Sequence, residues 1–303
     1  MGALCGKIPR FFRGILFSGL WVPVGTMQGV SYNKTMQTNQ SLVEFATALA
    51  REAGAIISDY FYHANRSDVR QKSNNTPVTD ADIQINQLVI DRLHEAYPEH
   101  GVLGEEQSYE ADRRELWVCD PIDGTSALAH GVPTALFSLA YVVDGEPQVA
   151  VIFDPFQDVM LTAVRGGGAF CNGKQVHVTD RTSLEGTTVG ATASYVQAIE
   201  RKEAFDWLTE RKVSLLLVPG NVFRTSLVTR GYIDAHIFPG RGAHDVAAAA
   251  LIVTEAGGKV TDLDGNSQRY DRAIRGAIIS NGHIHDDLVK AVAMLGSEQF
   301  LGF

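Results

Sequence analysis

The sequence predicts an α+β fold, in which helices and antiparallel strands alternate in layers. Three patterns predict it: apolar residues at helical spacing come first, apolar strands joined by tight turns follow, and helices and strands mix in the rest of the chain. The 303 residues are 45% hydrophobic and 20% charged, which is typical of a soluble globular protein. This composition excludes disorder for the bulk of the chain and allows a large core without disulfides.

Two helices are predicted before the first long strand. Ser41 and Glu44 form a capping-box pattern. The apolar residues that follow them recur at helical spacing, and they are Leu42, Phe45, Leu49, Ala53, Ile56 and Tyr60. Thr79 and Asp82 indicate the start of a second helix, which ends near Pro98.

A run of strands begins at Glu115. Residues 135–155 are predicted to form two strands joined at Asp144 and Gly145, and residues 159–178 repeat the pattern around Asn172 and Gly173. Asp-Gly and Asn-Gly are the preferred residues of two-residue hairpin turns. Consecutive strands with such short connections predict an antiparallel meander rather than βαβ units.

The chain after residue 184 mixes the two kinds of element. Helices are predicted over residues 197–211, 223–230 and 244–258, and Gly257 and Gly258 end the last of them. Strands are predicted in the segments TTVGATA, VSLLLVP, YIDAHIF, KVTDLDG and AIISN. We therefore interpret residues 41–303 as a single unit whose two halves meet near residue 184.

Residues 1–40 are predicted to form a basic leader outside this unit. No acidic residue precedes Glu44, whereas the first 35 residues contain the basic residues Lys7, Arg10, Arg13 and Lys34. The apolar run among them is interrupted by glycine and proline and is too short for a membrane span. The leader is either a disordered extension or the product of an upstream start codon, with Met27 or Met36 as the true start. Residues 1–35 leave export or organelle targeting open.

The net charge and the cysteines restrict the partners and the compartment. With 26 Lys+Arg against 35 Asp+Glu, the net charge of −9 opposes binding to nucleic-acid polymers. An anionic substrate would need a cation to bridge it to such a chain, and a divalent metal ion is the usual one. The three cysteines have no C-x-x-C spacing, which argues against zinc and disulfides and favours the reducing cytoplasm.

Acidic residues gather where predicted elements begin or end. Glu105 and Glu106 follow one predicted strand, Asp120 and Asp123 lie at the end of another, and Asp245 opens a predicted helix. Clustered carboxylates repel one another unless a cation or a shared proton holds them. Oxygen ligands without His or Cys clusters favour Mg²⁺ or Mn²⁺ over Zn²⁺. Taken singly, each acid also fits an ordinary role in a helix cap, a loop or a turn.

The sequence resembles the inositol monophosphatase superfamily, the magnesium-dependent, lithium-sensitive phosphomonoesterases. The resemblance runs from about Ser41 to the C-terminus. Five motifs carry it: KSNNTPVTDAD (72–82), GEE (104–106), DPIDGT (120–125), GGGAFCNG (166–173) and HDVAAAALIVTEAGG (244–258). It implies a layered α/β/α/β/α sandwich of the inositol monophosphatase and fructose-1,6-bisphosphatase type, and a homodimer.

The resemblance also implies a metal site holding two to three Mg²⁺ ions. The implied metal ligands are Glu105, Asp120, the backbone carbonyl of Ile122, Asp123 and Asp245. Asp82 would pair with Thr125 to orient the attacking water, with Glu105 beside a third, weaker ion. Gly124, Thr125 and Asp245 would contact the phosphate or the substrate. Metal ions held this way clamp a phosphate and activate water for in-line transfer.

Three positions depart from the family pattern. Ser126 follows Thr125 in a segment that usually reads x-N-F, and His244 stands where the family usually has tryptophan. Phe238 occupies the position at which animal inositol monophosphatases carry a glutamate that contacts the ring hydroxyls. A phenyl ring cannot accept a hydrogen bond from a hydroxyl, so specificity for inositol stays open.

Several arginines have two interpretations. Arg241, Arg224 and Arg230 could contact an anionic substrate, or they could be solvated loop residues. His244 could donate to the substrate or could be a packing residue beside the metal ligand.

The sequence thus predicts a Mg²⁺-dependent phosphatase that acts on a small phosphorylated metabolite, with inositol monophosphate as the default substrate and no membrane partner. The alternatives are histidinol phosphate, a 3′-phosphonucleotide or a sugar phosphate as substrate, or a catalytically silent metal-binding relative. Every expected ligand and catalytic residue is present, which favours the active enzyme. No G-x-S-x-G elbow and no strand–GxGxxG–helix pattern supports a serine hydrolase or a dinucleotide fold.

Overall fold

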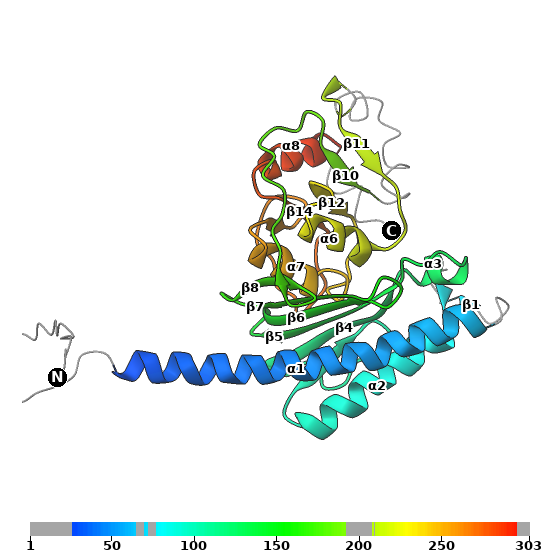
Figure 1. Cartoon of the computed structure of the whole chain (residues 1–303), viewed down its shortest axis with the longest axis vertical. Helices are drawn as coiled ribbons and strands as arrows, with labels where there is room; N and C mark the ends of the chain where they lie inside the picture. The colour runs from blue at the N-terminus through cyan, green and yellow to red at the C-terminus, as the bar shows by residue number, and fades with distance from the viewer. Residues whose placement is uncertain (1–25, 65–69, 72–76, 192–207, 209, 296–303) are drawn as a thin grey trace, which may run out of the picture. The chain divides into compact units, whose positions relative to one another are not determined.

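The structure is a computed structural model that describes residues 26–64, 70–71, 77–191, 208 and 210–295 (Figure 1). It divides the chain into two compact units, residues 1–38 and residues 39–303. Residues 1–25 of the predicted leader and almost all of the predicted helix 197–211 lie outside the described residues.

The described helices are α1 (Thr26–His63), α2 (Asp80–Ala96), α3 (Thr125–Ala129), α6 (Asn221–Thr229), α7 (Ala247–Glu255) and α8 (His285–Leu295). The strands of the first half are β1 (Arg70–Gln71), β2 (Pro77–Val78), β3 (Gly101–Gly104), β4 (Glu115–Asp123), β5 (Leu136–Val143), β6 (Glu146–Asp154), β7 (Val159–Val164), β8 (Gly168–Cys171) and β9 (Lys174–Gln175). Those of the second half are β10 (Thr188–Gly190), β11 (Ser214–Leu216), β12 (Ala235–Phe238), β13 (Lys259–Thr261) and β14 (Ala277–Ser280).

The larger sheet has seven strands in the order β3-β4-β5-β6-β7-β8-β9. Strands β4 to β9 are antiparallel neighbours, which confirms the predicted meander, while β3 pairs in parallel with β4. Both predicted turns have positive φ at their two central residues, 52° and 81° at Asp144 and Gly145 and 48° and 76° at Asn172 and Gly173. This is the backbone that the twist of a two-residue hairpin requires.

The smaller sheet has five strands in the order β11-β10-β12-β14-β13. Strand β10 pairs in parallel with β11 and with β12, whereas β14 is antiparallel to both of its neighbours. All five predicted strands of the second half are present, but the sheet mixes both kinds of pairing. Helix α6 lies in the connection from β11 to β12, and parallel strands need crossover connections of this kind.

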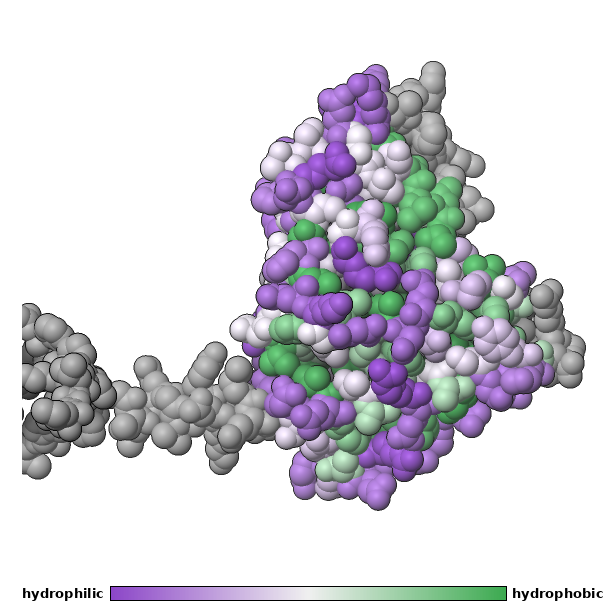
Figure 2. All heavy atoms as spheres, in the orientation of Figure 1, coloured by the Kyte–Doolittle hydropathy of each residue, from purple (hydrophilic) through white to green (hydrophobic). Residues whose placement is uncertain are grey.

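The unit 39–303 is built in five layers, which confirms the α/β/α/β/α sandwich. Helix α2 and the part of α1 from Leu42 onward pack on one face of the larger sheet. Helices α6 and α7 pack on its other face and contact the smaller sheet, whose far face packs on α8 (Figure 1). Hydrophilic residues lie over α2 in Figure 2, as expected for a helix whose apolar side chains face the sheet.

Two helices differ from the prediction. Helix α1 begins at Thr26, so Ser41 lies inside it and the predicted capping box does not form. No proline interrupts residues 26–41, so the helix can extend toward the N-terminus beyond Ser41. A capping pattern favours a helix start but does not prevent the residues before it from being helical. Helix α8 was not predicted, although Asp286 and Asp287 in its first turn favour a helix N-terminus and were an available signal. No helix among the described residues has both the length and the hydropathy of a membrane span.

The glycine motif of residues 166–168 and the end of α7 are held together by Glu255. Its carboxylate accepts the backbone N–H groups of Gly166 at 2.7 Å and Gly168 at 2.8 Å. This contact joins the β7–β8 hairpin to the layer of α6 and α7. It gives two of the five family motifs a shared structural role.

His285 is a buried neutral histidine in the smaller sheet's outer layer. Its Nε2 lies 2.9 Å from Thr261 Oγ1 and its Nδ1 lies 2.8 Å from Ser280 Oγ. Thr261 Oγ1 donates to the carbonyl of Asp262, so it accepts from Nε2–H, and Nδ1 accepts from Ser280. Burial, together with the charge of Lys259, lowers the pKa of His285 from 6.5 to about 4.

We expect this histidine to make the protein less stable in mild acid. Because the folded state favours the neutral ring, His285 contributes its full stabilisation of the fold above pH 6.5. This contribution is lost as the pH falls from 6.5 toward 4. Between pH 7 and pH 5, the free energy of unfolding of the native protein should fall by about 1–2 kcal/mol more than that of His285→Gln. Urea denaturation at both pH values measures the difference. The exposed neighbour His283, changed to Gln, is the matched control, and an equal fall in native protein and His285→Gln would contradict the assignment.

Candidate active site

Strand β4 ends in the acidic motif DPIDGT and delivers two aspartates to one place. The register of β4 against β5 shifts between Asp120 and Asp123, so the strand is irregular there. Both side chains are buried, with Asp120 2% exposed and Asp123 5% exposed. Asp245 comes from the turn that precedes α7. Carboxylate oxygens of these three residues all lie within 4.8 Å of one another.

The cluster has the chemistry of a site for a hard divalent cation. Its donors are all carboxylate oxygens, the ligands that Mg²⁺ prefers. The Oδ1 atom of Asp120 is buried and has no hydrogen-bond partner among the described residues. A buried carboxylate oxygen without a partner is costly unless a cation contacts it. The residues therefore fit the metal that the resemblance implies.

The electrostatics of Asp120 support the same interpretation. Burial raises its pKa well above the ordinary value, and the charges of Glu105, Asp123, Asp245 and Asp82 raise it further. Glu105 lies close enough to act on Asp120, and its backbone N–H donates to the carbonyl of Cys119 at 3.1 Å. Glu105 is half-buried at the edge of the cluster rather than among the three converging carboxylates.

Asp82 and Thr125 form the predicted pair. Thr125 Oγ1 lies 2.9 Å from Asp82 Oδ1 and 3.0 Å from the carbonyl of Ile122. The other oxygen of Asp82 accepts from the backbone N–H of Thr79 at 2.7 Å and from its hydroxyl at 2.5 Å, in the capping box predicted for α2. Burial raises the pKa of Asp82 to about 6, against the opposing hydrogen bonds from Thr79 and Thr125. A carboxylate with a pKa near neutrality is suited to accept a proton.

Asp123 has a second role at the start of α6. Its carboxylate accepts the backbone N–H groups of Asn221 at 2.9 Å, Val222 at 2.8 Å and Phe223 at 3.4 Å. It therefore caps the N-terminus of α6 from another part of the chain. Burial raises the pKa of Asp123 to about 6, and the charge of Arg224 and these backbone hydrogen bonds oppose the shift. Gly124 lies at the N-cap of α3, whose first residue is Thr125.

Phe238 and the three arginines with two interpretations differ in their burial. Phe238 is 8% exposed and belongs to the core cluster. Arg224 is 3% exposed, so neither the solvated interpretation nor direct substrate contact describes it. Arg241 is exposed, and Arg230 is half-buried with its guanidinium 5.0 Å from the ring centre of Tyr232.

His244 lies beside the cluster. Its Nε2 is 3.4 Å from Asp245 Oδ2, and the side chain is 22% exposed. The imidazole is therefore partly accessible at the edge of the acidic cluster.

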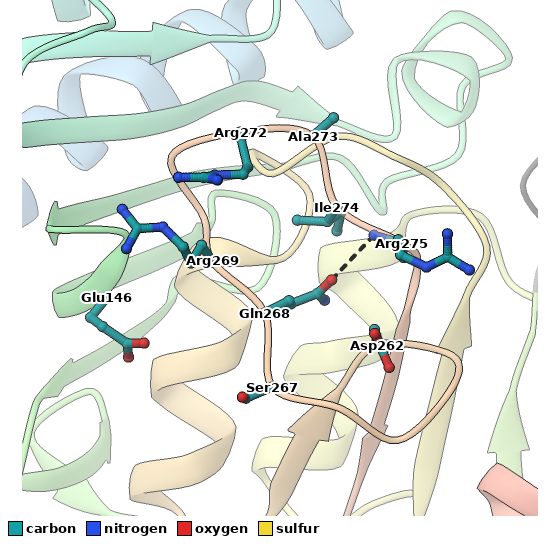
Figure 3. Close-up of a pocket in the computed structure, with 9 residues that line it drawn as sticks. All are labelled: Glu146, Asp262, Ser267, Gln268, Arg269, Arg272, Ala273, Ile274 and Arg275. Atoms are coloured by element: carbon teal, nitrogen blue, oxygen red, sulfur yellow. Dashed lines mark hydrogen bonds between the residues drawn. The ribbon is translucent and has the colours of Figure 1, made fainter.

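Figure 3 shows a separate pocket of about 290 Å³ that none of the predicted site residues line. Three arginines border it, and their guanidinium groups already pair with carboxylates. Arg269 and Arg272 both contact Asp271, and Arg275 lies 3.2 Å from Asp264. Glu146 and Asp262 add negative charge to the lining. We assign this pocket no role in the chemistry of the acidic cluster.

Sequence reasoning missed two residues near the cluster, Asn221 and His236. Asn221 Nδ2 donates to the backbone carbonyl of Asp245 at 2.7 Å, and His236 contacts Asn221. An asparagine after a glycine at a predicted helix start was the available signal for Asn221. No local pattern pointed to His236.

Known proteins are similar to this chain in sequence and in fold. The model of the inositol monophosphatase family matches residues 38–296. A fructose-1,6-bisphosphatase/inositol-1-monophosphatase of Thermotoga maritima is 34% identical over 256 residues, 82% of this chain and 95% of that protein. A solved inositol monophosphatase of Thermotoga maritima superposes with a TM-score of 0.76 at 29% identity, covering 86% of this chain and 99% of its own.

A further solved structure, an inositol monophosphatase/NADP phosphatase complexed with NADP and Ca²⁺, has a TM-score of 0.73 at 26% identity. The match covers 84% of this chain and 94% of that one. The fold, the acidic cluster and these likenesses agree. The chain belongs to the inositol monophosphatase family and is a phosphoric monoester hydrolase.

Proposed function

We propose that the protein hydrolyses a small phosphate monoester, similar to inositol monophosphate, with Mg²⁺ as its cofactor. The convergence of Asp120, Asp123 and Asp245 within 4.8 Å, beside the bonded pair of Asp82 and Thr125, carries the proposal. When bound, two to three Mg²⁺ ions would neutralise the carboxylates, draw in the phosphate and polarise the attacking water. Glu105 and the carbonyl of Ile122 would complete the ligand set.

The chain's own residues supply the proton path. Asp82 Oδ2 is occupied by Thr79, so only Oδ1 is directed to Thr125. A single hydroxyl hydrogen on Thr125 can go to Asp82, which leaves the lone pairs of Oγ1 to accept from a water molecule. Thr125 would thus take the water's proton as it passes its own to Asp82. The backbone N–H groups of Gly124 and Thr125, at the start of α3, would contact phosphate oxygens.

The leaving group is the second part of the proposal. Inositol monophosphate is the default substrate, but Phe238 is buried in the core and offers no acceptor for ring hydroxyls. The relatives act on other phosphates: their names include a fructose-1,6-bisphosphatase and an NADP phosphatase. Histidinol phosphate and 3′-phosphonucleotides stay alternatives of the same chemistry.

A substrate panel tests the proposal. We expect Mg²⁺-dependent phosphate release from at least one of inositol 1-phosphate, fructose 1,6-bisphosphate, NADP, histidinol phosphate and adenosine 3′,5′-bisphosphate. EDTA should abolish the release, and millimolar Li⁺ should reduce it. Release that persists in EDTA would overturn the metal dependence. A folded protein that releases phosphate from none of them would favour the catalytically silent relative.

A further inference from the structure

Asn221, the first residue of α6, connects two of the clustered aspartates. Its backbone N–H donates to Asp123 Oδ1 at 2.9 Å, and its side-chain Nδ2 donates to the backbone carbonyl of Asp245 at 2.7 Å. Asp123 ends β4, whereas Asp245 precedes α7. One residue therefore contacts both segments of chain that supply the cluster, and its position constrains the distance between them.

His236 fixes the orientation of the Asn221 side chain. Its Nε2 lies 2.5 Å from Asn221 Oδ1, and its Nδ1 lies 3.2 Å from Arg224 Nε and 3.1 Å from the carbonyl oxygen of Gly190. The amide nitrogen of Asn221 donates to Asp245, so its Oδ1 faces His236 and can only accept, and Nε2 therefore carries the hydrogen. Burial lowers the pKa of His236, so the ring is neutral and Nδ1 accepts from Arg224 rather than donating to Gly190. The amide oxygen of Asn221 is thereby assigned to His236, and its nitrogen to Asp245.

Arg224 anchors this chain of hydrogen bonds. It is 3% exposed, and burial lowers its pKa to about 10, while attraction to Asp123 and Asp245 opposes the shift, so it stays protonated at neutral pH. Gly190 makes room for it, since a Cβ there would lie 3.0 Å from Arg224 Cδ and 3.3 Å from His236 Nδ1. A buried polar network of this kind holds one arrangement firmly when each member is satisfied.

We propose that Asn221, held by His236 and Arg224, is a positioning residue that sets the separation of Asp123 and Asp245 and thereby the affinity of the cluster for its metal ion. The inference rests on the proposed function, because it assumes that the three carboxylates bind a divalent cation. Partners of metal ligands commonly change metal affinity by 10–100-fold when they are replaced.

Two substitutions at His236 separate positioning from packing. His236→Phe keeps a ring of similar size but removes both hydrogen bonds, whereas the amide of His236→Gln can still donate to Asn221 and accept from Arg224. Titration calorimetry with Mg²⁺ alone, on metal-stripped protein, reads the affinity without turnover. We expect the dissociation constant to rise about 10-fold in His236→Phe and less than about 3-fold in His236→Gln.

A matched control is Asn281→Ala, at a buried asparagine whose Nδ2 donates to Thr179 Oγ1 at 3.0 Å and to the carbonyl of Arg181 at 2.9 Å. It should lower Tm and leave Mg²⁺ affinity unchanged. If His236→Phe does not fold, Asn221→Ser, which keeps the backbone bond to Asp123, should weaken Mg²⁺ binding several-fold.

The outcomes are distinguishable. A His236→Phe protein that binds Mg²⁺ like the native chain, with only a lower Tm, overturns the inference alone, as does an unchanged affinity in Asn221→Ser. A native chain that binds no divalent cation overturns the proposed function together with the inference. A loss of affinity in His236→Phe that His236→Gln restores supports the positioning role.

Discussion

Replacing Asp120 with asparagine should lower kcat/KM by about 10³-fold or more, which corresponds to ~4 kcal/mol of transition-state stabilisation. The same change should abolish the rise in Tm that Mg²⁺ produces in the native protein. Without metal, the Tm of Asp120→Asn should equal or exceed that of the native chain. Phosphate release and thermal denaturation, each with and without Mg²⁺, measure the three effects.

The loss of activity and of metal stabilisation has the same cause as the equal or higher Tm without metal. Asp120 is buried among like charges, so its ionised form is costly until a cation is present, and its pKa is raised well above the ordinary value by burial and by its acidic neighbours. An asparagine of nearly the same shape removes that cost and also removes the charge that binds the metal. A residue that only stabilised the fold would lower Tm in both conditions.

Asp154 provides the matched control. It is also a buried aspartate at the end of a strand of the same sheet, its pKa is raised by burial, and its Oδ2 has no hydrogen-bond partner among the described residues. Its Oδ1 accepts from the backbone N–H groups of Phe156 and Gln157 rather than joining the cluster. Asp154→Asn should keep kcat/KM within about 3-fold and keep the Mg²⁺ effect on Tm. Equal losses in both variants would contradict the metal assignment to Asp120.

The fold was predictable where local chemistry decides the structure. The turns at Asp144 and Asn172 follow from their glycine neighbours, and the start of α2 follows from the capping box of Thr79. The start of α1 was not predictable from Ser41, because a capping pattern marks a favourable start and does not prevent the helix from extending toward the N-terminus.

Part of the candidate site was likewise predictable from local sequence, and part depends on tertiary packing. Asp120 and Asp123 could be placed together because they share one turn. The contact of both with Asp245 depends on how α7 packs on the larger sheet, which no local pattern encodes, so only the family resemblance pointed to it. Arg224 and His236 come from α6 and β12, and their burial beneath the cluster is a property of the packed layers rather than of either segment.

Replacing Thr125 with valine should lower kcat by about 10²–10⁴-fold while the Mg²⁺ dissociation constant changes little. Valine keeps the shape of threonine but has no hydroxyl, so the bond of 2.9 Å to Asp82 is lost and no acceptor for the water's proton is left at this position. The carboxylates of the proposed metal site are untouched. Steady-state kinetics at saturating Mg²⁺, with calorimetry for the metal, separate the two effects.

Thr125→Ser is the matched control, since it restores the hydroxyl and should recover most of the activity. Asp82→Asn should cause a loss similar to that of Thr125→Val, because both remove the same proton path. The two losses should not add in the double variant, since residues that act as a unit are strongly non-additive. Additive losses would mean that Asp82 and Thr125 act separately. A Thr125→Ser protein as inactive as Thr125→Val would show that packing at this position, rather than the hydroxyl, limits the reaction.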